Sequence, residues 1–225
     1  MPPIRAITFD VGGTLMHPWP SVGHVYAEVA SHYGIRHVSP EKLNSRFAAA
    51  WKSRRDFRHT REHWAALVTE VFEMDSGQVQ VFFPELYERF GGAESWRLFD
   101  DVLPALNALA SLGIDLAVIS NWDERLRPLL FGLGLGRYFE TVIVSCETGF
   151  TKPSSVMFEL AARKLGTPPE SILHVGDDFD RDTMGAKAAG FQALLIDRAG
   201  AQSGGERIRS LADLEKLALA GRYGS

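Results

Sequence analysis

The sequence predicts an α/β fold: a Rossmann-like parallel sheet with helices on both faces, plus a helical domain inserted after the first strand. Short segments that are apolar throughout are typical of strands buried on both faces of a parallel sheet. Here such segments alternate with helical patterns, and this alternation indicates parallel pairing. The insertion shows helical periodicity and no convincing buried strand.

Each element of the predicted core follows from its residue pattern. Five apolar segments are predicted as strands: 4–9, 116–120, 141–145, 172–176 and 193–197. Helical patterns cover 102–112, 124–133 and 155–165, and glycine follows each of them, as is common just past a helix end. A last amphipathic helix is predicted over 210–219, with Ser210 as its N-cap.

The stretch 17–96 is predicted as a separate helical domain, because it is too long for an ordinary connection. The core domain then consists of 1–16 and 97–225. Within the insertion, helical patterns cover 22–33, 40–55, 61–73 and 79–90. Open parallel sheets bind ligands at the carboxyl ends of their strands, so we expect the inserted domain above that edge.

Composition predicts a soluble cytoplasmic protein. Of the 225 residues, 45% are hydrophobic and 23% are charged, and the formal net charge is −4. This charge balance gives no reason to expect nucleic-acid binding, which needs a basic surface. No apolar run is long enough for a membrane span. The N-terminus shows no apolar signal region. A single cysteine, Cys146, excludes an internal disulfide and fits a reducing compartment.

Four polar clusters lie at or just after the ends of predicted strands: Asp10, Ser120 with Asn121, Lys152, and the acidic loop 177–182. Because parallel strands end at one edge of the sheet, these clusters are expected to converge. A carboxylate such as Asp10 can attack phosphorus, and carboxylates from two loops suit Mg²⁺. Hydroxyl, amide and ammonium groups suit the oxygens of a transferring phosphoryl group.

Four segments resemble the motifs of the haloacid dehalogenase-like hydrolase superfamily. They are F-D-V-G-G-T-L (9–15), V-I-S-N (118–121), T-K-P-S-S-V-M-F (151–158) and H-V-G-D-D-F-D-R-D-T-M-G-A (174–186). They occur in the superfamily's order, and the insertion is placed like its helical C1 cap. The Gly-Gly pair before Thr14 and the S-N-W-D-E-R-L stretch look like the branch called haloacid dehalogenase-like hydrolase domain-containing protein 3.

The resemblance implies a role for each matching residue. Asp10 is the implied nucleophile and a metal ligand, with the backbone carbonyl of Gly12 and with Asp177 as further ligands. Asp182 is implied as a ligand or as an anchor for metal-bound water. Ser120 and Asn121 are the implied phosphoryl-binding residues, and Lys152 balances charge on Asp10 and the phosphate. The implied cofactor is Mg²⁺ and the implied substrate a small phosphorylated metabolite, turned over by a monomer or a homodimer.

Gly12 departs from the pattern, because phosphatases of this superfamily carry a second aspartate there as general acid and base. A positioned acid–base group contributes about 10²–10⁴ in rate. Three explanations stay open: an activated substrate such as an acyl phosphate, an acid supplied by the inserted domain or the substrate, or feeble turnover.

Other functions also fit part of the pattern. Gly12 suits a 2-haloacid dehalogenase, although the acidic loop does not. Phosphonoacetaldehyde hydrolysis needs a lysine of the inserted domain that forms a Schiff base with the substrate. Lys52 is plausibly placed for this role, but the residues around it do not resemble the motif of that family. A degenerate protein that binds metal and ligand without turnover is a third alternative. The basic stretch 52–61 is expected to be a solvated face, with binding of an anionic substrate tail as the alternative, and His174 is expected to be a core histidine.

Overall fold

The computed structural model describes residues 2–54, 57–200 and 206–223. The chain forms two compact units: one consists of Met1–Met16 with Leu98–Ser225, the other of His17–Arg97. We call them the sheet unit and the helical unit. Among the described residues, none of the helices combines the length and the apolar character that crossing a membrane requires.

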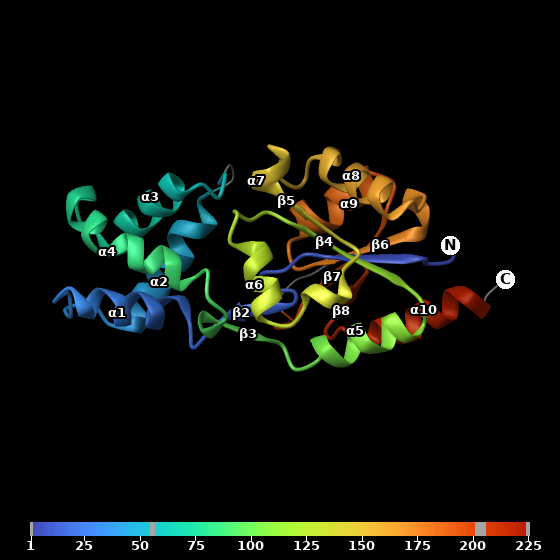
Figure 1. The fold of residues 1–225 in the computed structure, drawn as a ribbon, viewed down its shortest axis with the longest axis horizontal. Coiled ribbons are helices and arrows are strands. Elements are labelled where there is room, and N and C mark those ends of the chain that lie inside the picture. The colour runs from blue at the N-terminus through green and yellow to red at the C-terminus, as the bar shows by residue number, and fades with distance from the viewer. Residues whose placement is uncertain (1, 55–56, 201–205, 224–225) are drawn as a thin grey trace. The chain divides into compact units, whose positions relative to one another are not determined.

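The sheet unit is built on six parallel strands in the order β5-β4-β1-β6-β7-β8 (Figure 1). Their bounds are β1 Ala6–Phe9, β4 Asp115–Ser120, β5 Thr141–Val144, β6 Ile172–Gly176, β7 Gln192–Ile196 and β8 Arg207–Ile208. β1 is fully buried, as its continuous apolar run predicts. It lies between β4 and β6, so Phe9 pairs with both Val118 and Val175. The carboxyl ends of these three strands are therefore neighbours.

Helices cover both faces of this sheet, which confirms the predicted fold class. α5 and α10 lie on one side, and α8 and α9 lie on the other (Figure 1). The helices of the unit are α5 Val102–Ser111, α6 Leu126–Gly132, α7 Ser145–Thr148, α8 Ser155–Leu165, α9 Gly185–Ala188 and α10 Asp213–Tyr223. α8 packs its buried residues Met157, Phe158 and Ala161 against buried residues of the sheet. Burying such side chains contributes about 1.5–3 kcal/mol each for the large ones.

The helical unit consists of α1 Val22–His32, α2 Pro40–Lys52, α3 Arg61–Phe72 and α4 Ser76–Arg89. Its core is rich in aromatic rings; Tyr26 stacks on Phe72, for example, with ring centroids 5.8 Å apart. Each helix starts at a side chain that accepts a backbone hydrogen bond. At α4, Asp75 and Gln78 form a reciprocal capping box, the interaction that typically fixes a helix start.

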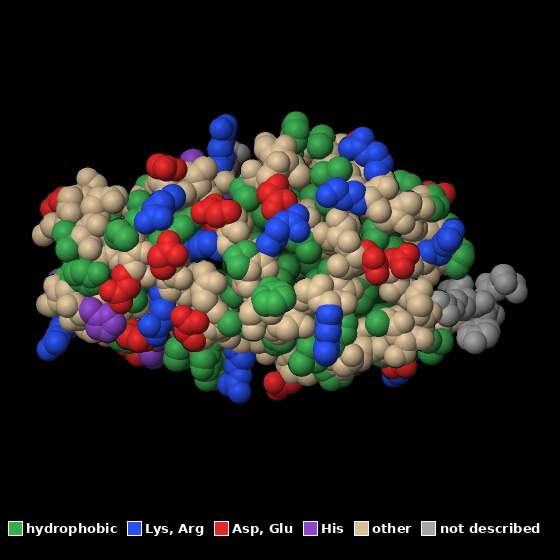
Figure 2. Space-filling view, viewed as in Figure 1, with side chains coloured by type: hydrophobic (Ala, Val, Ile, Leu, Met, Phe, Trp, Pro, Cys, Tyr) green, Lys and Arg blue, Asp and Glu red, His purple; other side chains and the backbone are tan. Residues whose placement is uncertain are grey.

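Arginines of the basic stretch pair with acidic residues of the same unit. Arg54 donates to Glu70 at 2.7 Å, and Arg61 lies 3.7 Å from Glu88 and over the ring of Tyr87. Where Figure 2 shows α1–α4, basic and acidic side chains lie interspersed. This favours the solvated-face interpretation for those two arginines. Arg55 lies outside the described residues.

Some local predictions were incomplete. The sequence did not reveal β2 (Met16–Pro18) and β3 (Trp96–Leu98), which form a separate two-stranded sheet, or the short edge strand β8. α10 starts at Asp213 rather than at Ser210. The hydroxyl of Ser210 accepts from the backbone N–H of Ala212 at 3.2 Å and also donates to Asp101 at 2.7 Å. Asp101 further accepts two hydrogen bonds from Arg198 and one from the backbone N–H of Leu211.

Candidate active site

Asp10 stands at the carboxyl end of β1, and its backbone N–H donates to the carbonyl of Val175 in the neighbouring strand β6 at 2.9 Å. The residue is buried, with 8% of its surface exposed. The hydroxyl of Ser120, the last residue of β4, donates to Asp10 Oδ1 at 3.1 Å. Ser120 thus faces Asp10; α6 begins only at Leu126, with Arg125 as its N-cap residue. Ser120 therefore does not cap α6.

Lys152 joins two carboxylates from different parts of the chain. Its Nζ donates to Asp10 Oδ1 at 2.7 Å and to Asp182 Oδ1 at 2.5 Å, and the residue is 3% exposed. Charge-assisted hydrogen bonds of this length are among the stronger ones in proteins. The ammonium group therefore positions Asp10 while its charge opposes protonation of the carboxylate.

Asn121 acts on the backbone that carries Lys152. Its Oδ1 accepts from the Lys152 N–H at 2.7 Å, and its Nδ2 donates to the Lys152 carbonyl at 3.1 Å. Both polar ends of the amide thus bind one residue of a loop that is 31 positions away in the sequence. The geometry makes Asn121 a positioning residue for Lys152.

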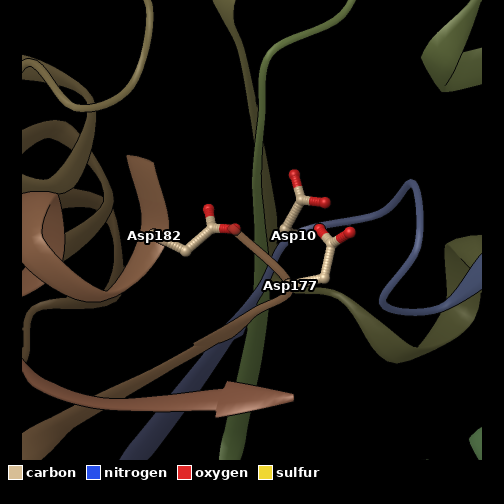
Figure 3. Close-up of side chains that lie close together, drawn as sticks. All are labelled: Asp10, Asp177 and Asp182. Atoms are coloured by element: carbon tan, nitrogen blue, oxygen red, sulfur yellow. The ribbon is translucent and has the colours of Figure 1, made fainter. Parts of the chain in front are cut away.

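Asp10, Asp177 and Asp182 form a cluster of carboxylates (Figure 3), with one oxygen from each within 4.8 Å of the others. Asp177 follows β6 directly, and Asp182 lies in the wide helical turn Phe179–Met184. Two glycines permit the close approach. A Cβ at Gly13, whose φ is +80°, would lie 2.2 Å from Asp177 Oδ2, and one at Gly176 would lie 2.2 Å from Asp182 Cγ.

The pKa values within this cluster are pushed apart. Burial raises the pKa of Asp10, although the charge of Lys152 opposes the shift. Burial together with the charges of Asp10 and Asp182 raises the pKa of Asp177 to about 8. Burial would also raise the pKa of Asp182, but the charge of Lys152 and the hydrogen bond from His174 hold it well below its ordinary value. When all three are ionised, the carboxylates around one ammonium leave excess negative charge, which a divalent cation would neutralise.

His174 and Thr8 form a hydrogen-bonded chain to Asp182, which the sequence analysis did not predict. His174 lies in β6 and is fully buried, as a core histidine would be, and its Nε2 lies 3.2 Å from Asp182 Oδ1. Its Nδ1 lies 2.9 Å from the hydroxyl of Thr8 in β1. Burial lowers the pKa of His174, so the neutral ring donates from Nε2 to the carboxylate and accepts from Thr8. The sequence signal for this contact was a polar residue within each of two apolar strands, Thr8 in β1 and His174 in β6, which are register partners.

Sequence comparison assigns the family of this site. The family model of haloacid dehalogenase-like hydrolases matches residues 4–190, a span that includes Asp10, Ser120, Lys152 and the acidic loop.

The chain belongs to the haloacid dehalogenase-like hydrolase family.

Individual relatives of this hydrolase agree with the assignment. The haloacid dehalogenase-like hydrolase domain-containing protein 3 of Xenopus laevis is 34% identical over 206 residues, which cover 86% of this chain and 84% of the relative. The crystal structure of a HAD phosphatase from Thermococcus onnurineus superposes with a TM-score of 0.69 at 26% identity, covering 97% and 99% of the two chains. That of a 2-haloacid dehalogenase from Pseudomonas syringae pv. Tomato DC3000 gives 0.68 at 25% identity, covering 96% and 98%.

Proposed function

We infer that this haloacid dehalogenase-like hydrolase is a magnesium-dependent phosphatase that acts on a small phosphorylated metabolite through an aspartyl-phosphate on Asp10. The observation that carries the proposal is the buried Asp10 carboxylate, held at one oxygen by Ser120 and Lys152 and clustered with Asp177 and Asp182. A nucleophilic carboxylate beside hydroxyl and ammonium donors is the arrangement that phosphoryl transfer requires.

The chemistry runs in two displacements at phosphorus. An oxygen of Asp10 forms a bond to phosphorus, while the bond to the leaving oxygen breaks and the leaving group takes the electron pair. Water then attacks the aspartyl-phosphate, and the electrons of the breaking P–O bond return to the Asp10 carboxylate. The water gives up one proton to solvent, and inorganic phosphate is released. Ser120 and Lys152 donate to the phosphoryl oxygens, where charge builds up.

The residues present fit a magnesium ion. Carboxylate oxygens are the ligands that Mg²⁺ prefers, and the cluster carries excess negative charge beside a single lysine. Asp10, Asp177 and the carbonyl of Gly12 would hold the ion. Both oxygens of Asp182 already accept hydrogen bonds, from Lys152, His174 and the Asp178 N–H, which favours an anchoring role for Asp182. When bound, the ion supplies charge neutralisation at the phosphoryl group.

Further properties complete the proposal. The helical unit is inserted directly after β1 and, by family resemblance, serves as the cap domain that selects the substrate. We propose a cytoplasmic enzyme, monomeric or homodimeric, whose partner is its small-molecule substrate.

One observation favours a second candidate, a 2-haloacid dehalogenase. Gly12 offers no acid–base group, and a departing halide needs none; the dehalogenase of Pseudomonas syringae also shares the fold. The carboxylates of Asp177 and Asp182 beside Asp10 argue against it, because attack of a carboxylate on carbon gains nothing from additional negative charge. A degenerate protein that binds metal without turnover stays a third alternative, again because of Gly12.

The test is an assay of the purified protein, with and without Mg²⁺, against acetyl phosphate, para-nitrophenyl phosphate, sugar and nucleotide monophosphates, and 2-chloropropionate. Asp10→Asn removes the nucleophile with little change in volume. The matched control is Asp115→Asn, which alters an exposed aspartate at the start of β4 in the same sheet.

The proposal expects Mg²⁺-dependent phosphate release that Asp10→Asn abolishes and Asp115→Asn retains. Chloride release from 2-chloropropionate without metal would establish the dehalogenase instead. Metal binding with no turnover and no phosphorylation of Asp10 would establish the degenerate protein.

A further inference from the structure

The space beside Gly12 is occupied by an aromatic ring. A Cβ built on Gly12 would lie 3.2 Å from Trp122 Cζ3 and 3.9 Å from Trp122 Cη2. Chain neighbours aside, no other described residue brings an atom within 4 Å of that Cβ. A side chain at position 12 would therefore point into the indole, two residues after the proposed nucleophile Asp10.

Trp122 lies in the segment that follows β4, and its backbone is held by the first residues of α7. Its backbone N–H donates to Ser145 Oγ at 3.0 Å, and its carbonyl accepts from the Ser145 hydroxyl at 2.9 Å and from the Cys146 N–H at 3.2 Å. Trp122 lies two residues after Ser120, the last residue of β4, whose hydroxyl donates to Asp10. The backbone of Trp122 is thus fixed relative to the nucleophile.

The titratable groups around Asp10 that the structure describes are committed to other contacts. Lys152, Asp182 and His174 are hydrogen-bonded to one another or to Asp10, and Asp177 belongs to the proposed metal cluster. The indole contributes an apolar face where a proton donor would otherwise stand, because its single N–H is not an acid at neutral pH.

We propose that Trp122 occupies the space that a proton-donating side chain at position 12 would need, and that the missing acid restricts this hydrolase to phosphate compounds whose leaving group departs without protonation, chiefly acyl phosphates. This inference rests on the proposed phosphatase function and names its substrate class.

The chemistry of both half-reactions agrees with that class. When Asp10 attacks an acyl phosphate, the P–O bond breaks and the electron pair leaves on a carboxylate, whose conjugate acid has a pKa of about 4. The aspartyl-phosphate formed on Asp10 is itself an acyl phosphate, so the second displacement also expels a carboxylate. An alkyl phosphate would instead expel an alkoxide, a strong base that needs a proton donor.

The experiment measures kcat/KM for acetyl phosphate, para-nitrophenyl phosphate, phenyl phosphate and glycerol phosphate, at saturating Mg²⁺. For the wild-type chain we expect a steep fall along this series, with glycerol phosphate at least about 10³-fold below acetyl phosphate, within the contribution of a general acid. The double variant Gly12→Asp/Trp122→Ala introduces a carboxyl group together with the space it needs. We expect the double variant to reduce the ratio of kcat/KM for acetyl phosphate to that for glycerol phosphate about 100-fold. Trp122→Ala alone should leave this ratio unchanged.

The outcomes separate this inference from the function on which it rests. Equal kcat/KM for glycerol phosphate and acetyl phosphate in the wild-type chain would overturn the inference and leave the phosphatase intact. Phosphate release from none of the four compounds would overturn the phosphatase itself. The wild-type series decides the inference even if the double variant does not fold. A decrease of the acetyl phosphate to glycerol phosphate ratio in Trp122→Ala alone would show that the ring blocks the leaving group sterically, which also contradicts the inference.

Discussion

The close approach of Gly13 to Asp177 yields a prediction that separates backbone strain from metal binding. Gly13 has a φ of +80°, and a Cβ there would lie 2.2 Å from Asp177 Oδ2 and 2.7 Å from Asp177 Cγ. Gly113 has a φ of +66° with no atom within 4 Å of its Cβ position. Both lie in the sheet unit. Gly13→Ala therefore adds strain and displaces a carboxylate, whereas Gly113→Ala adds strain alone.

The expected magnitudes follow from these distances. A left-handed conformation costs a residue with a Cβ about 1–2 kcal/mol, and each kcal/mol lowers the melting temperature of a chain of this size by about 2–4 °C. Both variants should thus melt below the wild type. In Gly13→Ala the Asp177 carboxylate must also move by about 1 Å to reach ordinary contact distance. A ligand present at 100 times its Kd stabilises the folded state by about 2.7 kcal/mol, and Gly13→Ala should lose most of that gain.

The assay is thermal unfolding of the three proteins with EDTA and with increasing Mg²⁺, and it needs no enzymatic turnover. We expect Mg²⁺ to raise the melting temperature of the wild type and of Gly113→Ala by equal amounts, and that of Gly13→Ala by much less. An undiminished response of Gly13→Ala to Mg²⁺ would refute the reasoning, because Asp177 could then move without consequence for the metal.

Two further predictions concern charged residues that are held by hydrogen bonds. Lys152→Met leaves the carboxylates of Asp10 and Asp182 without their shared cation, and breaking such a buried pair typically costs about 3–5 kcal/mol. Without Lys152, burial raises the pKa of Asp10 further, so the folded state binds a proton more tightly than the unfolded chain does. The loss of unfolding free energy, measured by urea unfolding, should therefore be smaller at pH 5 than at pH 8. Lys164→Met, which changes an exposed lysine, should neither lower the stability in this way nor make it depend on pH. Although burial opposes it, hydrogen bonds from Arg198, Ser210 and Leu211 hold the pKa of Asp101 below its ordinary value, so its stabilisation is complete above about pH 4 and is lost as the pH falls below that. The difference in unfolding free energy between wild type and Asp101→Asn should therefore be about 2–3 kcal/mol at pH 7 and clearly smaller at pH 3.5. A difference that does not change with pH would contradict this assignment, and so would an equal difference for Asp100→Asn, which alters an exposed neighbour.

Much of the sheet and the main site residues could be predicted from local sequence. The apolar runs around Ile7 and Val118 exclude half-exposed strands, because both faces must be covered by other elements. Parallel strands end at one edge, so Asp10, Ser120 and the acidic loop had to converge once those strands were recognised. The elements that escaped prediction, such as β2, β3 and β8, are too short to show a period of their own.

What the sequence determined by itself is the order of buried strands and helices, and which polar residues follow the strands, because both depend on residues that are near one another in the chain. The tertiary structure decided which atoms meet. Lys152 bridges Asp10 and Asp182. The side-chain amide of Asn121 binds the backbone of Lys152, and Trp122 fills the space beside Gly12. Those contacts join residues up to 142 positions apart, and distances between such residues depend on how the strands stack, which local patterns do not encode.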